Sequence, residues 1–306
     1  MKIDVIIPTY KPDDKLEKNL RMLRRQTLRP DRILLVNTEE DYFHSKEFYK
    51  LPQGEIIHIK KKDFDHGGTR NMAAARCDGD IILLLTQDAI PADRYMIENL
   101  VRPFTEDEDI CAAYGRQMAD YKDNPVEAYT RIFNYPKTSR IKSREDLPTL
   151  GIKTFFCSNV CAAYRKSVYD ELGGFPLHTI FNEDMIYASR LIEAGKKIAY
   201  VADARVWHWH NYTAWQQLTR NFDLAVSQVD AGGLFLKVRS ESEGIRMVKQ
   251  TLLYFIRKGK WGYLPHIILQ NAAKYIGYKL GLNYRKLPRP LILKISLNPG
   301  YWDRSP

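Results

Sequence analysis

Asp88 stands at the end of an apolar run, in the stretch IILLLTQDAIP over residues 81–91. The run has the length of a buried strand, and a proline closes it. A carboxylate at the tip of a strand either caps the segment that follows or holds a divalent cation, which also binds phosphate oxygens. Asp88 by itself does not decide between the structural and the functional role.

Glu183 and Asp184 form an adjacent carboxylate pair in the stretch FNEDM. Adjacent residues of a helix point about 100° apart, so the two groups cannot have the same role. At the start of a helix, both carboxylates gain from the macrodipole without any catalytic function. The functional interpretation makes one of them a general base and the other a group that orients or binds the substrate.

His208 and His210 are spaced so that both imidazoles would share one face of a strand. Imidazole is a common metal ligand and a donor to phosphate. A packed, hydrogen-bonded histidine beside tryptophan is the structural alternative. The neighbouring Trp207, Trp209 and Trp215 offer flat faces on which an acceptor sugar could stack, or they belong to the core.

Arg70 follows the glycine pair Gly67 and Gly68 in the stretch FDHGGTRNMAAARCDGD. The glycines allow a tight backbone just before a helix, and Arg70 on its first turn could reach a phosphate or a base. Glycine pairs are common in turns, so this motif is weak when it is taken alone.

The elements expected around these residues alternate between strands and helices. Short apolar strands are predicted at 2–8, 31–37, 55–59 and 80–85, with helices at 13–26 and 68–76. This pattern is typical of an α/β fold with a mostly parallel sheet covered by helices on both faces. Because such sheets bind ligands at the carboxyl ends of their strands, PTY, NTEED and TQDA are expected along one rim.

The middle of the chain is less regular. The polar segment 139–151 is expected to be a mobile loop, and a strand is expected at 197–201. Helices are predicted at 126–133, 183–194 and 214–229, with Asn182 as a cap and Gly195 as a stop. A glycine pair at 232–233 suggests a boundary between a domain over 1–232 and a helical extension over 233–306.

Charge is concentrated in that extension. The chain of 306 residues carries a net charge of +10, and the residues from Phe235 onward hold 14 Lys and Arg against 3 Asp and Glu. Aromatic residues lie among the basic ones. The extension either packs on the core with solvated basic faces or lies on an anionic membrane surface. Nucleic acid is not expected as a partner, because no nucleic-acid motif accompanies the charge.

Hydropathy and cysteine content indicate the class of protein. At 44% hydrophobic residues the chain can build a sizeable core, and we expect neither a membrane span nor a signal peptide. The four cysteines, at 77, 111, 157 and 161, lie in apolar surroundings without metal spacing. We interpret them as reduced core residues of a cytosolic protein.

The order of the motifs is more specific than any one of them. VIIPTYKPD, GGTRNMAAARCDGDIILLLTQDA, CAAYRKSVYDELGGF, NEDM and AYVADARVWHWHN follow one another between residues 2 and 230. In this order they resemble glycosyltransferase family 2, the inverting nucleotide-sugar transferases of GT-A fold. DHGGTRN, TQDA and HWHNYT are most similar to bacterial rhamnosyltransferases, which build surface polysaccharide from dTDP-L-rhamnose.

The resemblance implies roles for the residues. Asp184 is the expected base and Glu183 the orienting acid, while Mg²⁺ or Mn²⁺ would be held by Asp88 with His208 or His210. The residues expected at the nucleotide-sugar donor are Pro8, Thr9, Tyr10, Asn37, Glu39, Arg70, Gln87 and Asp88. The acceptor would be a glycan or a polyprenyl-linked glycan, and the enzyme would be peripheral on the cytoplasmic face of the plasma membrane.

Two departures from the family pattern concern the donor. The turn after the second strand reads VNTEED, so Asn37, Thr38 or Glu39 must replace the usual acid, and the DxD motif is reduced to TQD. Both departures fit a donor other than a UDP-sugar. The alternatives are a transferase that uses UDP- or GDP-sugars and a non-catalytic binding protein. A nucleotidyltransferase is disfavoured because the amino-terminal stretch PTYKPDDK contains no glycine-rich loop. A processive synthase is disfavoured because no membrane span is expected and no QxxRW-like motif follows HWHN.

Overall fold

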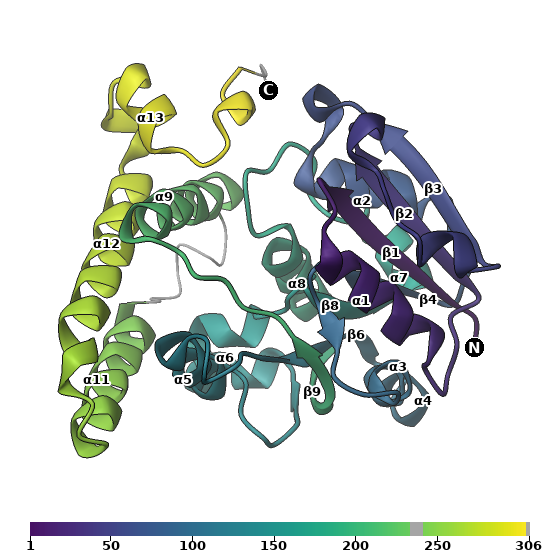
Figure 1. Cartoon of the computed structure of the whole chain (residues 1–306), viewed down its shortest axis with the longest axis horizontal. Coiled ribbons are helices and arrows are strands. Elements are labelled where there is room, and N and C mark those ends of the chain that lie inside the picture. Colours follow the sequence, from purple (N-terminus) through teal and green to yellow (C-terminus); the bar gives the residue numbers. More distant parts are fainter. Residues whose placement is uncertain (233–240, 304–306) are drawn as a thin grey trace. The chain divides into compact units, whose positions relative to one another are not determined.

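The computed structural model describes residues 1–232 and 241–303 (Figure 1). These residues form two compact units. The first comprises Met1–Ala119, Tyr135–Leu177 and Glu183–Trp209, and the second comprises Asp120–Asn134, His178–Asn182 and His210–Pro306. The domain boundary expected at 232–233 falls beside residues outside the described ranges, and it stays a prediction.

The first unit is built on one mixed sheet. Its strands are β1 Ile3–Tyr10, β2 Arg32–Thr38, β3 Gly54–Ile59, β4 Ile81–Leu85, β5 Ile90–Pro91, β6 Ile110–Met118, β7 Arg140–Lys142, β8 Cys161–Arg165 and β9 Lys197–Trp207. Their order is β3-β2-β1-β4-β8-β6-β9-β5, with β7 paired to β9. The expected α/β sheet flanked by helices is confirmed.

The direction of the strands changes across the sheet. The strands β3, β2, β1 and β4 are parallel, as the sequence predicts. Strand β8 then runs antiparallel to both β4 and β6, and β9 is parallel to β6. The parallel arrangement is thus the rule in the amino-terminal half, and the whole sheet is mixed.

The helices of the first unit flank this sheet, and each of them except the short one at Leu147–Leu150 buries side chains. They are α1 Asp14–Arg24, α2 His66–Ala74, α3 Met96–Val101, α4 Pro103–Glu106, α6 Leu147–Leu150, α7 Lys166–Glu171 and α8 Glu183–Glu193. In α1, Leu16, Leu20 and Leu23 recur at helical spacing and enter the core formed by β1, β2 and β4. The Asp13 side chain caps α1 by accepting from the backbone N–H of Lys15.

The segment 139–151 is not the mobile loop that its polar composition suggests. It contains β7, a 3₁₀ turn at Arg144–Asp146 and helix α6. Ser143 and Asp146 form a capping box, and Arg140 pairs with Asp146 at 2.7 Å. Polar side chains here satisfy the backbone locally, which is why a polar segment is ordered. The expectation was wrong.

The second unit is helical, as expected for the carboxyl-terminal part. Its helices are α5 Pro125–Asn134, α9 Ala214–Ala231, α11 Glu241–Arg257, α12 Leu264–Leu282 and α13 Arg289–Ile295. Helices α9 and α12 pack closely, and a Cβ atom added at Gly277 of α12 would lie 2.1 Å from the carbonyl oxygen of Leu218. Phe222 and Val226 of α9 share a core with Ile292 and Ile295 of α13.

Two expectations from hydropathy and cysteine content can be compared with the structure. All four cysteines are buried and free, as predicted. Within the described ranges, no helix combines the length and the apolar character that crossing a membrane requires.

Candidate active site

Glu183 and Asp184 open helix α8, and Asn159 holds both carboxylates. The backbone N–H of Asn159 donates to Asp184 Oδ2 at 3.0 Å, and its side-chain Nδ2 donates to Glu183 Oε1 at 3.1 Å. The Tyr164 hydroxyl donates to Asn159 Oδ1, which fixes the end of the amide that faces Glu183. Asp184 Oδ1 accepts from the N–H of Met185 at 2.8 Å. The pair is therefore held in two different environments.

Arg70 on α2 lies against this pair. Its Nη1 is 3.3 Å from Glu183 Oε1 and donates to the carbonyl oxygen of His66 at 2.8 Å. A Cβ atom at Gly67 would lie 1.8 Å from the carbonyl oxygen of Pro176, so only glycine lets α2 begin at this place. The structure thus places the predicted nucleotide residue Arg70 at a carboxylate. Its contact with base or phosphate stays a prediction.

The two environments shift the pKa values of the two carboxyl groups in opposite directions. Burial and the neighbouring Glu183 raise the pKa of Asp184 to about 7, against the hydrogen bonds from Asn159 and Met185. Burial alone would raise the pKa of Glu183, but Arg70, His66 and Asn159 together lower it. Glu183 is thus the stable anion, and Asp184 exchanges a proton near neutral pH. This is the arrangement that a general base requires.

Asp88 and His208 meet at the end of β9. His208 follows the last residue of β9 rather than lying on the strand, and its Nε2 is 3.6 Å from Asp88 Oδ1. The Nε2 of Gln117 donates to the Ser158 hydroxyl at 3.0 Å, so Gln117 Oε1 accepts from His208 Nδ1 at 3.0 Å. A neutral His208 consequently turns the lone pair of Nε2 toward the carboxylate. Two acceptors that face each other in this way fit a shared cation.

The carboxyl ends of β1 and β2 lie in register at the expected rim. Thr9 pairs with Asn37 in the ladder, and the Thr9 hydroxyl donates to Asn37 Oδ1 at 3.1 Å. The side-chain amide of Gln87 binds both backbone groups of Tyr10, at 2.9 and 3.2 Å. Glu39 has a positive φ of 63° and accepts from the N–H of Lys61. Their contacts with a nucleotide, and that of Pro8 in β1, stay predictions.

The three tryptophans are divided between the two units. Trp207 ends β9 and packs edge-on against Trp209, and its side chain is 38% exposed. Trp215 is exposed in the first turn of α9. Their role toward an acceptor stays a prediction.

Sequence reasoning missed Asn159 and Gln117, which hold the carboxylates and His208. Asn159 lies in the stretch FFCSNVCAAYR, where an asparagine just before an apolar strand is the available signal. Gln117 is a polar residue that follows Arg116 near the end of strand β6, and it is buried. Buried polar side chains need partners, so a glutamine in such a strand points to a hydrogen-bonded network.

The chain is similar to known proteins along its whole length. The glycosyl transferase family 2 model matches residues 4–173. The O-antigen chain rhamnosyltransferase RfbN of Salmonella typhimurium is 40% identical over 99% of this chain and 96% of its own length. The O-antigen chain rhamnosyltransferase WbaN of Salmonella anatum is 37% identical over 98% and 95%.

Solved structures with 14% sequence identity share the fold. One is the mannosyltransferase PcManGT from Pyrobaculum calidifontis in complex with GDP-Man and Mn²⁺, with a TM-score of 0.62 over 92% of this chain and 87% of that one. Another is S. aureus TarS 1-349 in complex with UDP-GlcNAc, with a TM-score of 0.53 over 94% and 92%.

Proposed function

Because the chain belongs to glycosyl transferase family 2 and is a glycosyltransferase, we propose that it transfers L-rhamnose from dTDP-L-rhamnose with inversion. The acceptor is a glycan or a lipid-linked glycan of an O-antigen-type polysaccharide. The observation that carries the mechanism is the pair Glu183 and Asp184 on Asn159, in which only Asp184 titrates near neutral pH. A glycosyltransferase is an enzyme, so the chain is not a non-catalytic binding protein.

Asp184 is the general base of this proposal. It takes the proton from the acceptor hydroxyl while that oxygen attacks the anomeric carbon, and the bond from this carbon to the diphosphate oxygen breaks on the opposite face. The N–H groups of Asn159 and Met185 each bind one oxygen of the carboxylate, so they orient it toward the acceptor. Glu183 and Arg70 form a buried ion pair beside Asp184, so the charge next to the proposed base stays constant.

A divalent cation, Mg²⁺ or Mn²⁺, is proposed at Asp88 and His208. When bound, the metal would offset the charge that develops on the leaving diphosphate. The residues fit it, since a carboxylate oxygen faces an imidazole nitrogen and Gln117 fixes the tautomer through Nδ1. His210 follows His208 by two residues in the sequence, and it stays the third predicted ligand.

The donor nucleotide is proposed to lie along the carboxyl ends of β1, β2 and β4. Thr9, Asn37 and Gln87 form a hydrogen-bonded rim there, with Pro8, Tyr10 and Glu39 beside it. The absence of an acid at position 37 and of the first acid of a DxD motif argues against a UDP-sugar. UDP- and GDP-sugars are the alternative donors.

Calorimetric titration of the full chain with dTDP, UDP and GDP in the presence of Mn²⁺ tests the donor. The proposal expects dTDP to bind at least tenfold more tightly than the other two. A preference for UDP or GDP would refute the rhamnosyl donor while leaving the family assignment intact.

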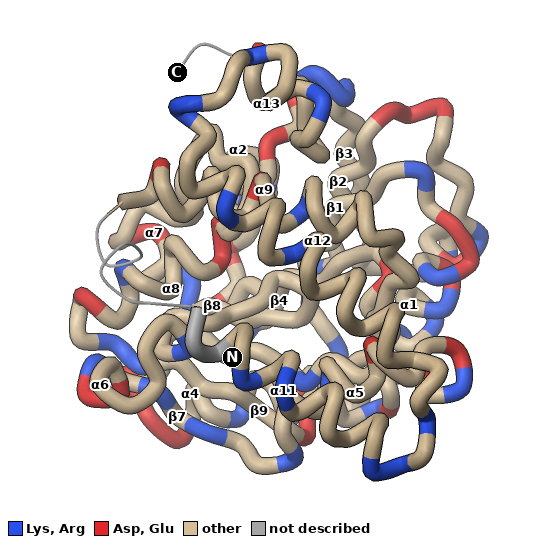
Figure 2. Tube along the Cα trace, turned by 90° about the vertical axis from the view of Figure 1, so that its left-hand side faces the viewer, with Lys and Arg blue, Asp and Glu red and all other residues tan. Residues whose placement is uncertain are grey.

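The basic carboxyl-terminal part is proposed to lie on the anionic inner face of the plasma membrane. Between Glu243 and Asp303 the chain has 11 Lys and Arg and no Asp or Glu. Helices α11, α12 and α13 therefore carry positive charges only from residue 244 onward, and Figure 2 shows these among uncharged positions. Such a segment is attracted to anionic lipid, and salt weakens the attraction.

Helix α12 adds an apolar surface to this charge. Its buried residues are Ile267, Gln270, Ala273, Gly277 and Gly281, and the two glycines lie against the backbone of α9. The outward face carries an apolar stripe, which is made by Ile268, Leu269, Tyr275 and Ile276, together with Trp261 just before the helix. Each of these five side chains is at least 50% exposed. Apolar and aromatic groups flanked by Lys and Arg are typical of helices that lie in the membrane interface.

A further inference from the structure

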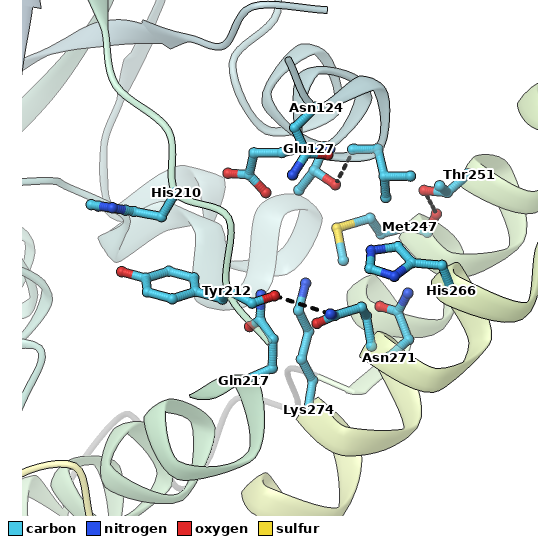
Figure 3. A pocket seen from close by; sticks show the side chains of 13 residues that line it. Asn124, Glu127, His210, Tyr212, Gln217, Met247, Thr251, His266, Asn271 and Lys274 are labelled. Carbon is cyan, nitrogen blue, oxygen red and sulfur yellow. Dashed lines mark hydrogen bonds between the residues drawn. The ribbon is translucent and has the colours of Figure 1, made fainter. Parts of the chain in front are cut away.

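A pocket lies wholly within the second unit (Figure 3). The start of α5, the segment 210–217, α11 and α12 form its walls, and its empty volume is about 450 Å³, part of which is open to solvent. Most side chains that line it are polar, and they come from segments up to 150 residues apart in sequence, from Asn124 to Lys274. Of these side chains, His210 is also proposed as a metal ligand, and the others belong neither to the carboxylate pair nor to the Asp88 and His208 site.

Gln270 provides a buried acceptor at this pocket. Its Nε2 donates to the carbonyl oxygen of Tyr212 at 3.0 Å, which fixes the orientation of the amide. Its Oε1 is buried and has no hydrogen-bond partner within the described residues. Buried amide oxygens are normally bound by a donor, so this atom calls for a hydrogen-bond donor from a ligand.

Lys274 provides the complementary donor, one turn further along α12. Figure 3 shows its ammonium group reaching into the pocket. Within the described ranges, no hydrogen bond or ion pair joins this ammonium to another residue. Glu127, which also lines the pocket, pairs with Arg131 at 2.8 Å instead. Burial lowers the pKa of Lys274, Glu127 opposes this and Arg131 adds to it. An oxygen acceptor would relieve the cost of burying the ammonium.

A flat surface and further amides complete the lining. The ring of Tyr212 lies 4.9 Å from that of His210 and below the Arg220 guanidinium at 5.5 Å, so its plane is fixed. Asn271 and Gln217 add side-chain amides at the edge. Aromatic faces beside amides and opposite charges suit a neutral ligand that is rich in hydroxyl groups.

We propose that this pocket binds a sugar ring of the acceptor glycan, with neighbouring hydroxyls that donate to Gln270 Oε1 and accept from Lys274 Nζ. The proposal rests on the proposed function, since it gives the acceptor a site. A hydroxyl both donates and accepts, so a sugar satisfies both atoms. An inorganic anion satisfies only Lys274, and it is repelled by the Glu127 carboxylate.

Saturation-transfer NMR on the full chain, without nucleotide or metal, tests the proposal. The probes are methyl α-L-rhamnopyranoside, methyl α-D-mannopyranoside and methyl α-D-galactopyranoside, with inorganic phosphate as a competitor. We expect at least one glycoside to receive saturation, and Lys274→Met and Gln270→Leu to reduce that signal at least fivefold. Lys279→Met, on the same helix outside the pocket, is the matched control and should retain it.

The expected outcomes separate binding from folding and from catalysis. Lys274→Met removes a desolvated charge but keeps the aliphatic stem, so its melting temperature should equal or exceed that of the wild type. Asp184→Asn should retain glycoside binding even though it loses transfer. The proposal is overturned if no glycoside receives saturation, if both pocket variants retain the signal, or if phosphate displaces the sugar.

Discussion

The most discriminating prediction concerns the charge next to the proposed base. Glu183→Gln preserves the shape of the side chain and an oxygen that can accept from Asn159 Nδ2. It removes the negative charge that, after burial, contributes most to the raised pKa of Asp184. The Arg70 cation loses its partner as well, so its attraction acts more strongly on Asp184. Both effects make ionisation easier, and the pKa of Asp184 should fall.

The expected change of kcat/KM with pH follows from the pKa of about 7 for Asp184. A base with this pKa is ionised to roughly one tenth at pH 6 and nine tenths at pH 8, so kcat/KM should rise about tenfold over this range. If Glu183→Gln lowers the pKa by about one unit, the rise shrinks to about twofold. The overall rate is also expected to fall, because the buried Arg70 loses its partner.

The assay is dTDP release from the donor in the presence of acceptor, measured between pH 5.5 and 8.5 for wild type and variant. Glu193→Gln is the matched control, since Glu193 is the exposed last residue of the same helix. Its pH profile should equal that of the wild type. If folded Glu183→Gln shows the rise of kcat/KM at the same pH as the wild type, or at a higher pH, Asp184 does not set the pH dependence.

Three further predictions concern the metal, the membrane and the fold. Asp88→Ala should weaken Mn²⁺-dependent nucleotide binding at least tenfold in calorimetry, because it removes the proposed carboxylate ligand. The double substitution Ile268→Ser with Leu269→Ser should reduce co-sedimentation with phosphatidylglycerol vesicles about tenfold or more, since two exposed apolar side chains are lost. Gly277→Ala should lower the free energy of unfolding by about 1–3 kcal/mol, because its Cβ atom meets the backbone of α9.

Each of these predictions has a control and a contrary result. Nucleotide binding by Asp88→Ala that is still strengthened by Mn²⁺ would count against the metal site. Tyr49→Ser removes an exposed aromatic side chain from the first unit and should leave vesicle binding unchanged. A wild type that fails to bind vesicles at low salt would refute the membrane proposal. Gly244→Ala, in open space on α11, should not destabilise the chain, and an equal loss there would contradict the packing argument.

The amino-terminal half of the fold could be predicted because its signals are local. The apolar runs that became β1, β2 and β4 and the leucines of α1 are spaced at strand and helix periods. The antiparallel insertion of β8 between β4 and β6 could not be predicted, since it joins strands about 50 to 80 residues apart in sequence. The secondary structure of residues 139–151 could not be predicted, because it depends on a capping box and on the pairing of β7 with β9.

The site shows the same division between local and distant information. Glu183, Asp184 and His208 could be selected by residue type and motif order. Asn159 precedes the carboxylates by more than 20 residues, and Gln117 precedes His208 by 91, so their contacts depend on the folded sheet. The acidity of Asp184 likewise follows from burial beside Glu183, which no spacing reveals.

The central claim is that Asp184 is the base of a sugar transfer, and one comparison tests it most directly. Asp184→Asn keeps the side chain's size and one oxygen acceptor for the N–H of Asn159 or Met185. Sugar transfer should fall by about 10²–10⁴-fold, while calorimetry with dTDP and Mn²⁺ gives unchanged affinity. Transfer by the folded variant at the wild-type rate would contradict the account.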